Sequence, residues 1–183
     1  MLNIEKLNEL AHIAIVGGKG VDQVMLLENA GAPVAGESVR PYPDGKPRLD
    51  ILGWSWGQTV AAIGAGADGS RHYTPLYVVR QADAACGSIA SLVYNRTRQV
   101  SATIENYRAG GDTSSPVTQS MFEFKVEEAQ VTEQYFLTHP ASGWLLEMLV
   151  FSYRKATVRS ASQQRTGARG AVRECTITLT GDA

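Results

Sequence analysis

Alternating apolar and polar positions recur along most of the chain and predict a protein built mainly of β-strands. The most informative run is Leu49–Thr59, LDILGWSWGQT, which carries two tryptophans at a spacing of two residues. Successive side chains of a strand point to opposite faces, so this run predicts one strand face that holds Leu52, Trp54 and Trp56. Two large aromatic rings on one face indicate that this face is covered by the core.

Further strands and one helix follow from the same kind of pattern. The segment Asp83–Asn95 has apolar residues every three to four positions, which predicts the single helix in the body of the chain. Many short strands with one helix predict a mainly β (α+β) fold, either a small β-barrel or a two-sheet sandwich, with the one short helix packed outside. The predicted strands are Gln23–Glu28, Thr74–Arg80, Ala102–Asp112, Phe122–Val131, Glu147–Ala156 and Val172–Thr180.

Three segments do not fit a central strand. Asn3–Ala11 has apolar residues at helical spacing, which predicts a short amphipathic helix; they are Ile4, Leu7, Leu10 and Ala11. Gly36–Pro47 contains three prolines and is expected to project or to lie on a sheet edge. Ser160–Gly170 is polar and basic, and we expect a mobile loop at 160–170.

Composition narrows the class of protein. A chain of 183 residues fits one domain, 1–183, and buries about 70% of the surface that its unfolded form exposes. Because 17 Lys and Arg face 18 Asp and Glu, no overall charge recruits nucleic acid or an acidic membrane. No secretory signal and no run of about 20 apolar residues is present, so we expect a soluble cytoplasmic chain. The only cysteines, Cys86 and Cys175, agree with a reducing compartment and are interpreted as small buried apolar groups.

Candidate catalytic and ligand-binding chemistry is scarce. Gly64–Gly69 satisfies the dinucleotide-binding pattern literally, but Ser70–Pro75 does not predict the helix N-terminus that would hold a pyrophosphate. The three histidines lie in separate segments without a ligand pair at helical spacing; they are His12, His72 and His139. We therefore predict no catalytic, cofactor-binding or metal-binding residues.

Four motifs, taken in order, carry a resemblance to a known family. They are Trp54-Ser55-Trp56-Gly57, Ala109-Gly110-Gly111, the aromatic strand Phe122 to Val131, and the run from Glu147 through Tyr153 to Lys155. Over roughly Asp22 to Lys155, this chain resembles the haemolysin-coregulated protein (Hcp) family, the tube-forming proteins of type VI secretion. Residues 1–20 are an N-terminal extension relative to that family, and the tail after Lys155 does not match it.

The resemblance implies a structural tube subunit rather than an enzyme. It implies hexameric rings that stack into a hollow tube, which a contractile sheath drives outward with a spike protein at its tip and secreted effectors in its lumen. Export without a signal peptide would follow from that route. It also makes the extended loop before the tryptophans a candidate ring-stacking loop, with Arg40, Asp44, Lys46 and Arg48 as its charged residues, and it makes Trp54 and Trp56 a core motif.

Two alternatives remain open from the sequence. One is the tail-tube protein of another contractile injection device, including a phage-like tail tube. The other is a cytoplasmic β-barrel that binds a small apolar ligand in an aromatic interior.

Overall fold

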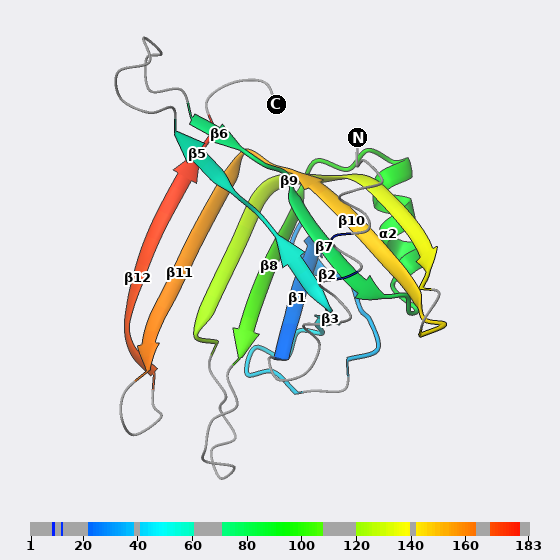
Figure 1. Ribbon diagram of the computed structural model, residues 1–183, viewed down its shortest axis with the longest axis horizontal. Helices are drawn as coiled ribbons and strands as arrows, with labels where there is room; N and C mark the ends of the chain where they lie inside the picture. The colour runs from blue at the N-terminus through cyan, green and yellow to red at the C-terminus, as the bar shows by residue number, and fades with distance from the viewer. Residues whose placement is uncertain are drawn as a thin grey trace.

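The structure is a computed structural model that describes residues 9, 12, 22–38, 41–60, 71–107, 120–139, 142–163 and 169–179. Strands dominate it, and a single helix is seen among the described elements of the body (Figure 1). The strands before the helix are β1 Asp22–Asn29, β2 Ala32–Pro33, β3 Leu49–Asp50, β4 Gly53–Ser55, β5 Gln58–Val60, β6 Arg71–Tyr73 and β7 Leu76–Gln81. The helix α2 Cys86–Tyr94 is followed by β8 Val100–Tyr107, β9 Phe122–Thr138, β10 Leu145–Ser152, β11 Lys155–Gln163 and β12 Arg169–Thr178.

Strand β9 belongs to two sets of antiparallel strands. Its first half, residues 122–129, pairs with β8 on one side and β11 on the other, and its second half, residues 130–138, pairs with β10. The register shifts against β8 between Val126 and Ala129 and against β10 between Val131 and Glu133, and Glu128 has a φ of +50°. An extra residue in one strand of an antiparallel pair bends that strand and increases its twist. The bend therefore carries one strand from the first set into the second.

The first set of strands has the order β2, β1, β8, β9, β11, β12, and the second has the order β9, β10, β7, β4. Figure 1 shows β12, β11, the first half of β9, β8 and β1 side by side in a curved sheet, with β7 and β10 crossing on the side of α2. The described strands do not close into a barrel, since β12 pairs only with β11, and β4 only with β7. The prediction of a mainly β fold with one short helix is confirmed, in its two-sheet form.

The main core lies where the two sets of strands and the helix meet. Its fully buried side chains come from β1, β8, β9, β10 and α2, among them Leu27, Ile104, Phe124, Phe151 and Ile89. Alternation explains their place, because the residues between them on β1 and β8 face the other side of the sheet. Since these large side chains fill the interior, the fold gives no support to a barrel that holds an apolar ligand.

The tryptophan segment departs from the predicted single strand. Leu49–Thr59 is divided among β3, which pairs with β1, β4, which pairs with β7, and β5, which pairs with β6. The chain bends at Leu52, which packs against a different cluster from Trp54 and Trp56. The prediction that these three residues share a face is wrong, because the segment changes its pairing partner within three residues.

Two further expectations need correction at the C-terminal end. Ser160–Gly170 is not a loop at its ends, since β11 continues to Gln163 and β12 begins at Arg169; residues 164–168 lie outside the described residues. Cys175 is exposed rather than buried, because β12 is an edge strand with both faces open over most of its length. Of the N-terminal extension 1–20, only Glu9 and His12 are described, and both are helical.

Candidate functional site

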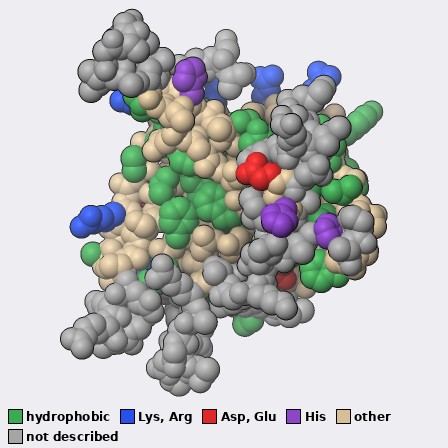
Figure 2. Space-filling view, viewed as in Figure 1, with side chains coloured by type: hydrophobic (Ala, Val, Ile, Leu, Met, Phe, Trp, Pro, Cys, Tyr) green, Lys and Arg blue, Asp and Glu red, His purple; other side chains and the backbone are tan. Residues whose placement is uncertain are grey.

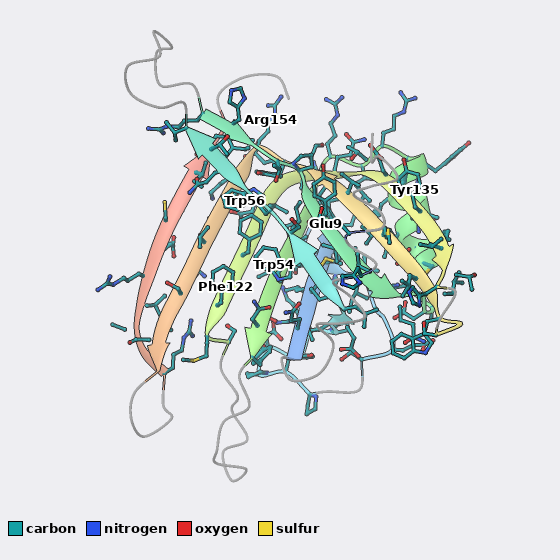
Figure 3. All side chains as sticks on the ribbon, in the orientation of Figure 1. Glu9, Trp54, Trp56, Phe122, Tyr135 and Arg154 are labelled. Atoms are coloured by element: carbon teal, nitrogen blue, oxygen red, sulfur yellow. The ribbon has the colours of Figure 1, made fainter. Side chains whose placement is uncertain are left out.

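Trp54 and Trp56 bind their segment to β9 through a layer of aromatic rings. Trp54 stacks on Phe122 and Phe124 with ring centroids 5.8 and 5.5 Å apart, and Trp56 lies 4.7 Å from Phe124 at a tilt of 40°. Such pairs add about 0.5–1.5 kcal/mol each beyond the area they bury. Figure 3 shows Trp54, Trp56 and Phe122 on one side of the sheet, and Figure 2 shows hydrophobic side chains gathered on that same face.

A hydrogen-bond chain extends this aromatic layer. The Trp56 indole N–H donates to the Tyr153 hydroxyl, which donates to the Thr74 carbonyl oxygen at 3.0 Å. Burial raises the pKa of Tyr153, so the hydroxyl stays protonated and keeps its donor at ordinary pH. Trp56 is thereby tied both to the end of β10 and to the start of β7.

The loop 41–48 folds onto the outer face of its own sheet. Tyr42 packs with Val24 and Tyr107, and the Arg48 guanidinium lies 4.7 Å from the centre of the Tyr42 ring. Arg48 is only 4% exposed; its Nε lies 2.8 Å from Glu105 and its Nη2 2.9 Å from Asp44. Two charged groups of the loop, Arg48 and Asp44, therefore form ion pairs within the subunit.

This geometry gives Arg48 a role within its own subunit. Its buried guanidinium pairs with the carboxylates of Asp44 and Glu105 and so anchors the loop 41–48, and its expected role in ring stacking stays a prediction. Burial alone would raise the pKa of Asp44, but hydrogen bonds from Arg48 and from the Lys46 backbone N–H hold it below its ordinary value. Asp44 and Lys46 remain 40% and 41% exposed, with Lys46 also 2.6 Å from Glu28. Arg40 lies outside the described residues.

A second ion-pair cluster, centred on the fully buried Arg80 and Glu147, was not predicted from the sequence. Arg80 on β7 and Glu147 on β10 are both 0% exposed and hydrogen-bond each other, and Arg80 also pairs with Asp83 before α2. Gln134 donates to Glu147 at 2.5 Å and to the Cys86 carbonyl oxygen at 3.2 Å. The Asp83 carboxylate accepts the N–H of Ala85 at 2.8 Å, at the start of α2.

This cluster fixes the helix against the second set of strands. Burial would raise the pKa of Asp83, but its hydrogen bonds with Arg80 and Ala85 outweigh that effect and lower it. Asp83 also accepts the Glu37 N–H at 3.2 Å, which ties the segment before the loop 41–48 to the same cluster. The function of these charges is structural, since each carboxylate is satisfied by groups of its own subunit.

Among the described residues, no group of three His, Cys, Asp or Glu side chains could hold a metal ion. Within the same part of the chain, no helix is long and apolar enough to cross a membrane. The features that the fold does present are sheet edges, an aromatic face and an ion-paired loop, which are those of a β-rich structural subunit.

Comparison with known proteins identifies the family. The sequence model described as "Type VI secretion system effector, Hcp" matches residues 25–159, which is most of the chain. The chain belongs to the Hcp family and is a tube protein of a type VI secretion system. No curated protein sequence matches it significantly.

Solved structures agree with this fold at low sequence identity. A type six secretion system protein is 20% identical with a TM-score of 0.70, over 86% of this chain and 95% of that one. Hcp1 from Escherichia coli is 15% identical with a TM-score of 0.64, over 84% and 97% of the two chains. Hcp1 from Salmonella typhimurium is 14% identical with a TM-score of 0.63, over 86% and 95%.

We expect Trp54→Ala to lower the free energy of unfolding by about 3 kcal/mol, near the low end for truncating a buried aromatic, because Trp54 is only partly buried. Trp56→Phe keeps a ring and loses the hydrogen bond to Tyr153, so its cost should be about 1 kcal/mol. Urea unfolding measures both values. Equal costs for the two variants would contradict the stacking described here.

Arg48→Met should destabilise the subunit by about 3–5 kcal/mol, because it leaves the Glu105 carboxylate without its buried partner. The matched variant Lys46→Met removes an exposed pair with Glu28 and should cost about 0–1 kcal/mol. The same unfolding titrations test both. If Arg48→Met costs no more than Lys46→Met, the loop is not anchored through Arg48.

Proposed function

We propose that this protein forms hexameric rings that stack into a hollow tube, which a contractile sheath and a spike protein deliver with secreted effectors in the lumen. The protein is then a structural component rather than an enzyme, made in the cytoplasm and exported without a signal peptide. Family membership supports this proposal. One feature of the fold also supports it, because it offers an exposed surface for contact between copies.

That feature is the hairpin of β11 and β12, which we call the wing. All six residues from 171 to 176 of β12 are exposed, although their strand alternates between two faces. Across the hairpin, Arg159 and Glu174 form an ion pair of 2.6 Å in which both side chains are nearly half exposed. A long unpaired edge with open faces invites pairing with another chain. In a closed ring the same wing of every copy would meet a different surface of the next copy.

One further surface, the loop 41–48, would receive the next ring. Asp44 and Lys46 remain partly exposed on the loop 41–48, although Arg48 does not. Contacts of exposed charges are worth about 0–1 kcal/mol each, so stacking would depend on several copies acting together. The stacking role therefore stays with Arg40, Asp44 and Lys46, while Arg48 holds the loop in place.

We expect the purified protein to show a native mass of six chains of 19.7 kDa each. Val172→Lys on the wing should abolish that mass, because a charge would be buried in the contact between copies, while the circular dichroism spectrum stays unchanged. Val60→Lys is the matched control, since Val60 is also exposed but lies on β5, outside the ten-stranded network. A parent mass of one chain, or rings that survive Val172→Lys, would contradict the role of the wing.

Arg40→Gln combined with Lys46→Gln should leave rings intact but prevent tube growth and secretion, because the change spares Tyr42 and Arg48, which hold the loop. Negative-stain electron microscopy distinguishes rings from tubes. Tubes of normal length would exclude these charges from stacking. Loss of the rings would instead assign the loop to the contact within a ring.

A further inference from the structure

The second half of β9, residues 130–138, is a sheet edge on the side of the molecule opposite the wing. It pairs with β10 on one side, and no other described strand pairs with it on the other. Figure 1 shows this half of β9 at one outer end of the molecule and β12 at the other. Between Gln134 and Thr138 the sequence has none of the charges or prolines by which an edge strand discourages pairing. This edge is therefore open to a further strand.

The backbone of this edge points outward at alternate residues. The His139 N–H donates to the Trp144 carbonyl oxygen at 2.8 Å, so residue 139 bonds toward the β10 side, and the register from Glu133 to Thr138 continues without a shift. In an antiparallel pair, residues that bond to the partner strand alternate with residues that do not. The residues that direct their N–H and C=O groups away from β10 are therefore Gln134, Phe136 and Thr138.

Strand β12 has the same arrangement on its own open edge. The Leu179 N–H donates to the Arg154 carbonyl oxygen at 2.8 Å, and the register of β12 with β11 runs without a shift from Thr178 to Val172. By the same alternation, Val172, Glu174 and Thr176 direct their N–H and C=O groups away from β11. Each edge thus presents donors and acceptors every second residue, about 7 Å apart, which is the repeat of an antiparallel ladder.

Exposed apolar side chains accompany both edges. The end of the β9–β10 hairpin carries four large apolar residues that are 36–51% exposed, and β12 carries Val172, which is 48% exposed. The four are Phe136, Leu137, Trp144 and Leu145. Clustered exposed apolar side chains mark contact sites, and a strand added to a sheet edge gains affinity from its backbone and specificity from such side chains.

We propose that the second half of β9 receives β12 of the neighbouring copy, so that the two strands pair through their backbones and the sheet continues from one copy to the next. This inference rests on the proposed ring and names the surface that the wing meets there. The two edges differ and lie at opposite ends of the subunit, so each copy donates one and accepts with the other, as closure by rotation requires. Pairing of β9 with β9, or of β12 with β12, would instead stop at a dimer.

A proline at Thr138 tests the backbone contact in the full-length protein. Thr138→Pro removes an outward N–H and blocks an incoming strand, while the bonds of β9 to β10 remain, and Thr138→Ala is the matched control that keeps the N–H. We expect the protein concentration at which rings fall apart into single chains to rise tenfold or more in Thr138→Pro and to stay unchanged in Thr138→Ala. Native mass over a dilution series measures this concentration. Rings equally resistant to dilution in the proline variant would overturn the proposal.

A second measurement needs no substitution. In the parent ring, we expect the amides of Gln134, Phe136 and Thr138 to exchange with deuterium at least tenfold more slowly than in an unstructured peptide of the same sequence, together with those of Glu174 and Thr176. Mass spectrometry with fragmentation to single residues reads each amide. A ring in which the three β9 amides exchange at the peptide rate would overturn this proposal and leave the proposed function intact. A native mass of one or two chains would overturn both.

Discussion

The arrangement of the whole subunit depends on one strand, β9, whose backbone hydrogen-bonds to three others. Its first half is held between β8 and β11, and its second half pairs with β10. The strand can serve both sets only because it bends near Glu128, where a positive φ is tolerated on an exposed side chain. Phe122 and Phe124 in the first half of β9 stack on Trp54 of β4, so the aromatic layer joins the two sets of strands.

The buried charges of the subunit form contacts within it, whereas the exposed strand β12 is free for contacts between copies. The buried charges pair with groups of the same subunit. The Arg80–Glu147 pair holds the helix, and the pairing of Arg48 with Glu105 holds the loop 41–48. Breaking such pairs is costly because the remaining charge stays buried, which makes these residues unsuitable for a reversible contact. The wing of β11 and β12, in contrast, leaves both faces of β12 exposed over residues 171–176. A protein that works by assembly needs this combination of a rigid body and an open edge.

Local patterns predicted much of this fold, and the reasons for the failures are physical. A short apolar run predicted β1, alternation predicted the first half of β9, and helical spacing predicted α2. No local pattern predicts the bend at Leu52. The bend arises because β3 pairs with β1, whereas β4, which follows it in the chain, pairs with β7. The Arg80–Glu147 pair joins residues 67 positions apart, and no spacing rule covers such a contact. The burial of Arg48 against Glu105 has no local signal either, because Glu105 is 57 residues away from this proline-rich loop. The strand pattern predicts a buried Cys175, and this prediction fails because the place of β12 at a sheet edge depends on the strand order rather than on its own sequence.

The most direct test of the account is an electron-microscopy reconstruction of the purified, full-length protein. The account predicts a ring of six copies around a central hole, in which β12 of each copy lies in the contact with its neighbour. A field of particles the size of one chain would contradict it. A ring in which β12 remains exposed to solvent in every copy would contradict it equally, because the open edge would then have no part in assembly.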